Sequence, residues 1–316
     1  MSDKYADRAP AAKVFRSGFI CLVGRPNAGK STLTNRIVGT KVAITSDRPQ
    51  TTRRTVRGVL TRQDFQLIVV DTPGLHRPRT LLGERLNDLV RETWTEVDAV
   101  GFCAAADEKT GPGDRYLAQQ LAQVQRGPVF ALITKVDQAS PDVIAQRLDS
   151  VQTMCADVGL EVAQFVPVSA VDGTNVEVLI DLLAAVMPVG QQLYPSDQLT
   201  DESQESMIAE LIREVALAGV DDELPHSIAV TIDEMGMRPD RRPDRPLMDI
   251  HATIHVERES QKPIIIGKGG SKLRVIGTNA RANIEALVGV PVFLDIHVRV
   301  AKEWQRDPKQ LRRLGF

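Results

Sequence analysis

The stretch Gly24–Ser31 reads GRPNAGKS and fits the pattern G-x-x-x-x-G-K-[ST]. It follows the apolar run Phe19–Val23 and precedes a helix-compatible stretch, so it lies where a strand would turn into a helix. Backbone N–H groups of such a turn surround phosphate oxygens, Lys30 reaches the β and γ phosphates, and the Ser31 hydroxyl binds Mg²⁺. A plain turn would not need Lys followed by Ser, and we therefore expect a nucleoside triphosphate as the ligand. The predicted contacts are Gly24, Arg25, Pro26, Asn27, Ala28, Gly29, Lys30, Ser31 and Thr32.

Two further polar segments follow in the order that a phosphate-binding fold requires. Asp71–Gly74 (DTPG) comes after the apolar run Leu67–Val70, which places a carboxylate and a glycine N–H at a strand end, near Mg²⁺ and the γ-phosphate. Alone, DTPG would be interpreted as a tight turn. Gln50–Arg54 lies between the two motifs and offers a hydroxyl to Mg²⁺ when a γ-phosphate is present; a polar surface loop is the alternative. The predicted residues are Asp71, Thr72, Pro73 and Gly74 for the nucleotide, Ser31, Thr52 and Asp71 for Mg²⁺, and Lys30, Thr52 and Gly74 for catalysis.

The base-reading segment is predicted at Thr134–Asp137, after the apolar run Val129–Ile133. Asp137 can accept hydrogen bonds from two donors on the edge of guanine, and the Lys135 stem can cover the face of the base. Adenine lacks that pair of donors, so GTP is favoured over ATP. A later tripeptide, Val168–Ala170, can offer a backbone N–H to the base. The predicted base contacts are Thr134, Lys135, Val136, Asp137, Ser169 and Ala170.

Apolar runs alternate with helical patterns through residue 187, which predicts an α/β fold of the P-loop NTPase class with a mostly parallel sheet. In such folds the ligand lies at the carboxyl ends of the strands. Strands are expected near 18–23, 56–60, 65–70, 98–103, 128–133 and 165–168, and helices at 81–95, 113–125, 141–157 and 174–186.

Basic residues gather in the last part of the chain. Residues 258–316 hold 12 Lys plus Arg against 5 Asp plus Glu, a net charge of +7, whereas residues 1–257 carry −9. The basic part surrounds a G-x-x-G loop that precedes the helix-compatible stretch Ser271–Val288. In KH modules such a loop clamps about four nucleotides of single-stranded RNA, because its glycines let the sugar-phosphate backbone approach. The predicted RNA contacts are Ile266, Gly267, Lys268, Gly269, Gly270, Lys272 and Arg274.

The surrounding pattern fits the bacterial, type II arrangement of the KH fold, a small α+β domain. A helix is expected at Gln204–Leu217, followed by strands at Ser227–Asp233, Met248–Val256 and Val292–Val300. The Pro- and Arg-rich stretch Arg238–Pro246 is interpreted as a mobile hairpin loop between two of these strands. An RNA or membrane contact through its arginines is the alternative.

The motifs GRPNAGKST, QTTR, DTPGLH, KVD and SA, followed by VERESQKPIIIGKGG, resemble the Era GTPases. The resemblance covers the chain from about Gly18 to the LRRLGF terminus. It implies a slowly hydrolysing GTP/GDP switch with Mg²⁺ that binds 16S rRNA near its 3′ end and assists assembly of the small (30S) ribosomal subunit. It also implies a cytoplasmic monomer, with a fraction in peripheral contact with the inner membrane. The expected domains are a flexible N-terminal extension at 1–17, a GTP-binding domain at 18–189, a linker at 190–202, a KH domain at 203–305 and a basic tail at 306–316.

The chain departs from the family pattern at the base-reading segment, where Thr134 stands in place of Asn, and we expect guanine selectivity to survive with weaker affinity. Leu75 occupies a position where many GTPases place a water-orienting Gln, so slow hydrolysis is expected. Asn27 is a candidate K⁺ ligand on the family resemblance; an Asn that merely tolerates a turn is the open alternative. His76 beside DTPG is interpreted as a surface residue and not as a general base.

Length and composition agree with this interpretation. The 316 residues leave room for two domains with a sizeable core. The chain has 3 Cys without C-x-x-C spacing, which suits core positions in a reducing cytosol better than disulfides or a metal site. Residues 1–17 lack the apolar core of a secretory signal, and no apolar run approaches the roughly 20 residues that span a bilayer.

Two functions of different class remain open at this point. In the first, the chain is a GTPase switch whose γ-phosphate contacts reposition the KH domain. In the second, it is an RNA-binding assembly factor whose nucleotide site is structural, with Thr134 and Leu75 as signs of relaxed catalysis. An ATPase is a distant third.

Overall fold

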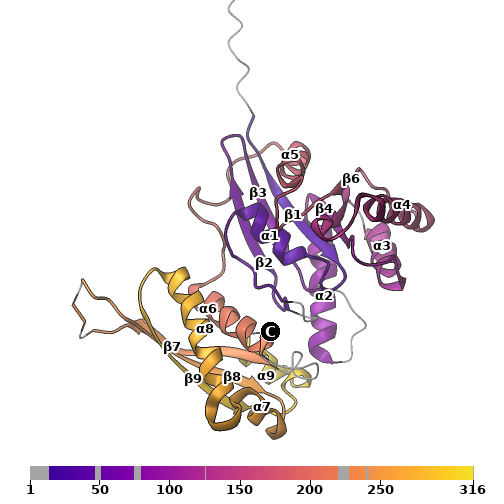
Figure 1. The fold of residues 1–316 in the computed structure, drawn as a ribbon. Coiled ribbons are helices and arrows are strands. Elements are labelled where there is room, and N and C mark those ends of the chain that lie inside the picture. The colour runs from indigo at the N-terminus through magenta and orange to yellow at the C-terminus, as the bar shows by residue number, and fades with distance from the viewer. Residues whose placement is uncertain are drawn as a thin grey trace, which may run out of the picture.

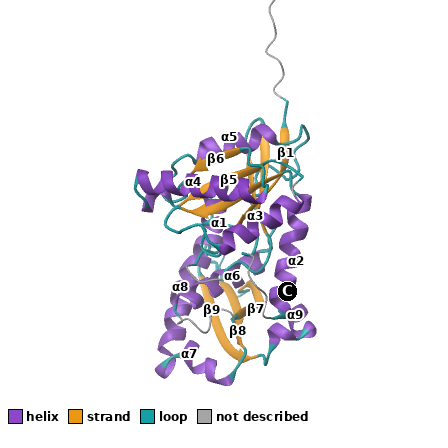
Figure 2. Ribbon diagram, turned by 90° about the vertical axis from the view of Figure 1, so that its right-hand side faces the viewer, coloured by secondary structure: helices purple, strands orange, loops and turns teal. Residues whose placement is uncertain are grey.

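The computed structural model describes residues 14–46, 51–74, 80–124, 126–219, 228–239, 241–242 and 244–315. The predictions for Gln50, Leu75 and His76 lie outside these residues. Figures 1 and 2 show two bodies, one with a sheet between two layers of helices and one with a small sheet under two helices. None of the helices in the described ranges is both long and apolar enough to cross a lipid bilayer.

The first body contains a 6-stranded sheet with the order β2-β3-β1-β4-β5-β6. Its neighbours pair in parallel except β2 and β3, so the predicted mostly parallel sheet is confirmed. Because β3 and β4 flank β1 on opposite sides, the loop after β1 lies where such folds hold ligands. The strands are β1 (Arg16–Gly24), β2 (Val56–Thr61), β3 (Phe65–Asp71), β4 (Ala99–Ala105), β5 (Val129–Thr134) and β6 (Gln164–Pro167).

Helices cover both faces of this sheet, since alternate residues of its buried strands serve two separate cores. In β1, Ile20 and Leu22 pack toward α1 (Lys30–Val38) and α5 (Val176–Val186). Cys21 and Val23, on the opposite face, pack toward the other three helices. These are α2 (Leu81–Glu96), α3 (Pro112–Val124) and α4 (Pro141–Val158).

The predicted core positions of the thiols are confirmed. Cys21, Cys103 and Cys155 are free and buried. Burial raises the pKa of Cys103 to about 12 and that of Cys155 to about 11, so both stay neutral thiols at physiological pH. They therefore act as small apolar side chains of the core.

The second body is a 3-stranded sheet with the order β7-β8-β9. The central strand β8 pairs antiparallel with β7 and parallel with β9, and α6 and α8 cover one face of the sheet. The elements are α6 (Gln204–Ala218), β7 (Ala229–Met237), β8 (Met248–Val256), α7 (Lys262–Ile266), α8 (Ser271–Val288) and β9 (Val292–Val300). The predicted bounds of α8, β8 and β9 coincide with the structure.

The prediction for β7 was wrong at its end. The predicted strand stops at Asp233, whereas pairing with β8 continues to Met237 after a bulge between Ile232 and Glu234. The bulge inserts an extra residue, so the apolar alternation is interrupted where two acidic residues follow each other. The sequence pattern therefore ends earlier than the hydrogen-bonded ladder does.

The segment that joins the two bodies is fixed to the edge of the first sheet. Thr200 forms a β-bridge with Gly58 of β2, and the carbonyl of Leu199 accepts from Val59 N at 2.9 Å. The Gln66 side-chain oxygen accepts from two further linker N–H groups, at 2.8 and 2.9 Å. The residues predicted as a linker thus extend the sheet edge beside β2.

The last residues fold back against the first body. Trp304 lies in a short 3₁₀ turn, and α9 (Pro308–Arg313) follows, capped by Asp307. Trp304 and Leu311 pack with Leu82 of α2, and Figure 2 shows α2 reaching this C-terminal segment. The residues predicted as a basic tail therefore carry an apolar side that touches both bodies.

We predict that Leu311→Ala destabilises the protein by about 2–5 kcal/mol, because Leu311 is fully buried and its truncation leaves a cavity. Urea unfolding followed by circular dichroism measures the change. Lys309→Ala, on the exposed side of the same helix, is the matched control and should change stability by no more than about 0.5 kcal/mol. Equal unfolding midpoints for the two variants would contradict the packing described for α9.

Candidate functional site

The phosphate loop occupies the turn between β1 and α1, and its glycines are required by the backbone geometry. Gly29 has φ 80°, a left-handed conformation that glycine adopts without strain. A Cβ on Gly24 would lie 2.6 Å from the carbonyl oxygen of Cys103, so no side chain fits there. The loop thus delivers backbone N–H groups at the start of α1, where the helix dipole favours an anion.

Lys30 is the first residue of α1, and its side chain folds over the loop. It is 7 % exposed, and its Nζ donates to the carbonyls of Gly24 at 3.1 Å and Arg25 at 2.9 Å. Burial lowers the pKa of Lys30, and the nearby charge of Asp71 opposes that shift. The ammonium group is therefore held beside the space that phosphates would enter.

Three oxygen-bearing side chains meet next to this lysine. Ser31 Oγ donates to Asp71 Oδ2 at 2.6 Å, and Thr52 Oγ1 lies 3.0 Å from Ser31 Oγ and 3.2 Å from the same carboxylate oxygen. Among the described residues, Asp71 Oδ1 is buried without a hydrogen-bond partner, and burial raises the pKa of this carboxyl. A buried carboxylate with an unsatisfied oxygen and two hydroxyls fits Mg²⁺, which prefers hard oxygen ligands.

A cavity of about 340 Å³ opens above the loop. Its walls include Asn27, Thr52, Gly74 and Lys135, so it brings together the phosphate loop and parts of three further predicted motifs, whereas Asp71, Asp137, Ser169 and Ala170 do not line it. A Cβ on Gly74 would lie 3.3 Å from the backbone nitrogen of Pro26, so a side chain here would crowd the loop. Asn27 has φ 64°, a conformation that Asn tolerates better than most residues, which agrees with the turn alternative.

Thr134 braces the phosphate loop. Its hydroxyl donates to the carbonyl of Ala28 at 2.8 Å, and both residues are buried. Part of what an Asn amide would do at this position is therefore done by the shorter side chain. The sequence analysis did not predict this hydrogen bond. The short Thr134 side chain reaches the Ala28 carbonyl only because β5 and the phosphate loop lie close together in the fold.

Asp137 lies at the exposed end of the base-reading segment, after a left-handed residue, Lys135, with φ 57°. Ser169 Oγ donates to Asp137 Oδ1 at 2.7 Å and so fixes the carboxylate. Lys135 Nζ lies 3.3 Å from Asp107 Oδ2, which holds its stem extended. Ser169 was predicted to contribute only a backbone N–H; its side-chain contact was missed, because strand-end tripeptides of this kind carry little pattern.

Some predicted nucleotide residues have structural partners instead. The Thr72 hydroxyl donates to the Leu22 carbonyl at 3.2 Å, and Arg25 Nη1 pairs with Glu108 at 2.7 Å. Val136 and Ala170 pack against the two apolar cores. These side chains support the loops that carry the polar contacts.

The G-x-x-G loop of the second body connects α7 to α8. Gly267, Gly269 and Gly270 have φ of 74°, 59° and 78°, so the loop requires glycine throughout. A Cβ on Gly269 or Gly270 would meet nothing within 4 Å, which leaves the backbone open to an approaching chain. The following helix begins at Ser271, and its N-terminus favours phosphate.

A groove of about 330 Å³ runs from this loop between α8 and the edge strand β9. Gly270, Arg274 and Arg281 line it together with Leu294 and Ile296. Arg281 was missed by the sequence analysis, although it lies seven residues after Arg274 on the same helical face. The predicted contact Lys272 lines a separate cavity on another side of α8.

The loop that carries Thr52 precedes β2, and its next two side chains bind the second body and the C-terminal segment. Arg53 is 2 % exposed, donates to the Ile228 carbonyl at 2.6 Å and lies 5.7 Å from the ring centre of Trp304. Burial and the neighbouring Arg213 lower the pKa of Arg53 to about 9, so the group stays charged at neutral pH. Arg213 in turn donates to the Thr51 carbonyl.

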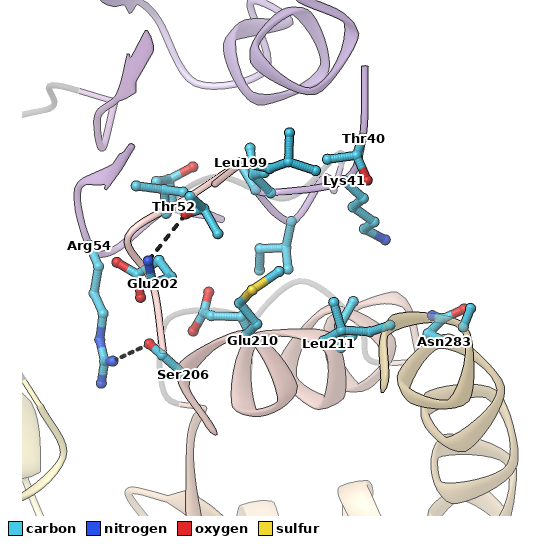
Figure 3. Close-up of a pocket in the computed structure, with 18 of the residues that line it drawn as sticks. Thr40, Lys41, Thr52, Arg54, Leu199, Glu202, Ser206, Glu210, Leu211 and Asn283 are labelled. Atoms are coloured by element: carbon cyan, nitrogen blue, oxygen red, sulfur yellow. Dashed lines mark hydrogen bonds between the residues drawn. The ribbon is translucent and has the colours of Figure 1, made fainter. Parts of the chain in front are cut away.

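Arg54 binds α6 and the C-terminal segment at once. Its guanidinium donates to Ser206 Oγ at 2.9 Å and to the Leu314 carbonyl at 3.1 Å. Beside it a cavity of about 660 Å³ separates the two bodies, with Lys41 on one wall and Leu211 of α6 on the other (Figure 3). The loop therefore touches the phosphate side and the second body within a few residues.

Comparison with known proteins places this geometry in a family. Residues 19–135 match the family described as 50S ribosome-binding GTPase, and residues 223–305 match the KH domain. The chain is 60 % identical over 307 residues to GTPase Era of Streptomyces coelicolor, covering 97 % of each chain. It is likewise 60 % identical over 301 residues to GTPase Era of a Nocardioides species, covering 95 % of this chain and 96 % of the relative.

Solved structures of Era share both bodies. The crystal structure of Era in complex with MgGDPNP and nucleotides 1506–1542 of 16S ribosomal RNA superposes with a TM-score of 0.89 and 35 % identity, covering 95 % of this chain and 99 % of that one. A variant of Aquifex aeolicus Era bound to GDP.AlF4⁻ gives 0.88 and 34 %, with the same coverage. The order of motifs, both folds and the near-complete coverage agree, and the chain belongs to the Era family of GTPases.

Proposed function

We propose that this GTPase is a nucleotide-operated switch that binds 16S rRNA near its 3′ end and assists assembly and maturation of the small (30S) ribosomal subunit. The observation that carries the proposal is the continuity of the loop 51–54. Thr52 lies in the oxygen cluster of the nucleotide site, while Arg53 and Arg54 bind the second body. A change at Thr52 is therefore transmitted to the KH domain along the backbone.

In this proposal Lys30 and the N-terminus of α1 bind the β and γ phosphates of GTP, and the Gly74 N–H meets the γ-phosphate. Ser31, Thr52 and Asp71 hold Mg²⁺, which neutralises charge on phosphate oxygens when bound. Asp137, oriented by Ser169, accepts from guanine, and Lys135 covers the base. Lys30, Ser31, Thr52, Gly74 and Lys135 all line the 340 Å³ cavity, which supports their roles, and Asp71 binds Ser31 and Thr52 beside it.

For the RNA partner, we assign the backbone clamp to Ile266–Gly270 and phosphate contacts to Lys268 and Arg274. The third predicted contact, Lys272, lies outside the groove and is not assigned to it. The solved relative holds nucleotides of 16S ribosomal RNA, whereas the description of the matched GTPase family names the 50S subunit. The solved relative covers 95 % of this chain, including the KH domain, and this supports 16S rRNA as the partner.

The proposed domain bounds are those predicted from the sequence, with the GTP-binding domain at 18–189 and the KH domain at 203–305. We propose that the protein acts as a monomer in the cytoplasm, with a peripheral membrane-associated fraction. Free, buried cysteines suit a reducing compartment and so support the cytoplasmic assignment.

We predict that Thr134→Val weakens GTP binding by roughly tenfold, because the Ala28 carbonyl loses its buried donor at a cost of about 1–3 kcal/mol. Thr134→Ser keeps the donor and serves as the control. Fluorescence titration with a labelled, non-hydrolysable GTP analogue measures both. If the Thr134→Val and Thr134→Ser proteins bound the nucleotide equally tightly, the hydrogen bond from Thr134 to Ala28 would not determine nucleotide affinity.

We also propose that Asn27 holds K⁺ during hydrolysis, where a monovalent charge would assist a slow reaction. GTP turnover is then faster in K⁺ than in Na⁺. Asn27→Gly removes the amide but accepts the same left-handed backbone, so it should abolish the difference between the two salts without unfolding the loop. Equal turnover of the unaltered protein in both salts would refute the assignment.

The switch itself is tested by RNA affinity at fixed salt with a non-hydrolysable GTP analogue, with GDP and without nucleotide, using nucleotides 1506–1542 of 16S rRNA. We expect tighter binding with the analogue, by roughly fivefold or more. Arg54→Gln should bring the ratio toward one, because both contacts to the second body are lost. Arg57→Gln, which removes an exposed ion pair with the linker, is the control and should keep the ratio.

Equal RNA affinity of the unaltered protein in all three states would instead favour an RNA-binding assembly factor with an uncoupled nucleotide site. No RNA binding in any state would remove the assignment of the KH loop.

A further inference from the structure

The face of the small sheet that points away from α6 and α8 carries side chains that neither the nucleotide site nor the G-x-x-G groove uses. Along β9, Leu294 and Ile296 pack toward the helices, so the alternating residues Phe293, Asp295 and His297 lie on the opposite face. His251 of β8 pairs in register with Asp295 and lies on that face as well.

These side chains form one connected cluster. The Arg238 guanidinium lies 5.3 Å from the ring centre of Phe293 and donates to both oxygens of Asp249, at 2.8 and 2.7 Å. The His251 ring lies 6.3 Å from that of Phe293, edge to face at 64°. Asp295 Oδ2 lies 3.5 Å from His251 Nδ1, so the rings are held in place by charged neighbours.

The cluster is open to solvent although it contains aromatic groups. Phe293 is 47 % exposed, and the side chain of His297 is 59 % exposed. The chain has only 8 Phe, 2 Trp and 3 Tyr, and among the described residues Phe293 and Tyr116 are the large exposed aromatic ones. An aromatic ring that is fixed in orientation yet unburied offers a flat surface for stacking.

One end of this face is covered, whereas Phe293, toward the other end, is 47 % exposed. The C-terminal segment covers Ala229 at the start of β7 through Trp304. Phe293 lies toward the opposite end of β9 and borders the groove, because the same edge strand supplies Leu294 and Ile296 to it. A nucleic-acid strand that leaves the groove across β9 therefore meets Phe293 first, and His297 lies four residues further along the strand.

We propose that this open face, formed by Arg238, His251, Phe293 and His297, is a second contact for single-stranded RNA, on which bases beyond those in the G-x-x-G groove stack. Proteins bind unpaired bases by stacking them on aromatic rings, His and Arg planes on open sheet surfaces. The carboxylates on this face, Asp249 and Asp295, each have a partner in the cluster, Arg238 and His251 respectively. Among the described residues of the cluster Phe293 is the apolar side chain, whereas a protein interface needs a larger apolar centre.

The inference rests on the proposed RNA binding by the KH domain, and the test separates the two. We would measure, at fixed salt, binding of a short RNA that fills the groove alone and of the same RNA extended at its 5′ end or its 3′ end. Phe293→Leu keeps an apolar side chain of similar volume but removes the ring, and Phe293→Tyr keeps the ring. Tyr116→Leu, at the exposed aromatic residue of the first body, is the matched control.

We expect Phe293→Leu to weaken binding of one extended RNA by at least about fivefold, the lower end of the loss for a stacking side chain. The same variant should bind the short RNA as the unaltered protein does. Phe293→Tyr and Tyr116→Leu should leave both affinities unchanged, and thermal unfolding should show that all three variants fold.

Two results would overturn the inference while leaving the KH assignment intact. Equal affinity of Phe293→Leu and the unaltered protein for every extended RNA would show that no base stacks there. A variant that binds all RNAs normally but binds small ribosomal subunits more weakly would show that the face contacts a protein. If even the short RNA fails to bind the unaltered protein, the proposed function fails first.

Discussion

The burial of a single guanidinium group, that of Arg53, constrains how the two bodies meet. A charge that is 2 % exposed is costly unless its donors are satisfied, and Arg53 finds the Ile228 carbonyl and the face of Trp304. These two partners come from the start of β7 and from the C-terminal segment. The loop that precedes Arg53 can therefore take this position only when both are in place, which makes the arrangement of the domains specific.

The nucleotide cavity and the cavity between the bodies share walls. Ile44 and Thr52 line both, although the two cavities have volumes of about 340 and 660 Å³. The space between the bodies is thus separated from the nucleotide by one loop and not by a packed core. Dense cores resist displacement, whereas a loop between two cavities has room to move. This distribution of packing supports the proposed switch, in which a change at the Thr52 hydroxyl alters the arrangement of the two domains.

Sequence analysis predicted the parts that local pattern determines. The phosphate loop, the buried strands and α8 follow from glycine spacing and apolar periodicity. The bounds of α8 coincide with the structure, and those of the strands in the first sheet lie within two residues of it. It could not predict contacts between distant segments, such as Arg53 with Ile228, which are 175 residues apart. The hydrogen bonds from Thr134 to Ala28 and from Ser169 to Asp137 also join segments that are distant in the sequence. The end of β7 was misjudged because a bulge interrupts the pattern but not the pairing.

The C-terminal segment has a consequence for synthesis of the chain. Trp304, Leu311 and Leu314 complete a core shared with α2, and the Leu314 carbonyl accepts from Arg54. Domains fold as units during synthesis, the N-terminal one first. The GTP-binding domain can therefore fold before residues 304–314 are made, and the contacts that join it to the second body form later. A chain truncated before Trp304 would keep the nucleotide motifs and the G-x-x-G loop but lose these contacts between the two bodies.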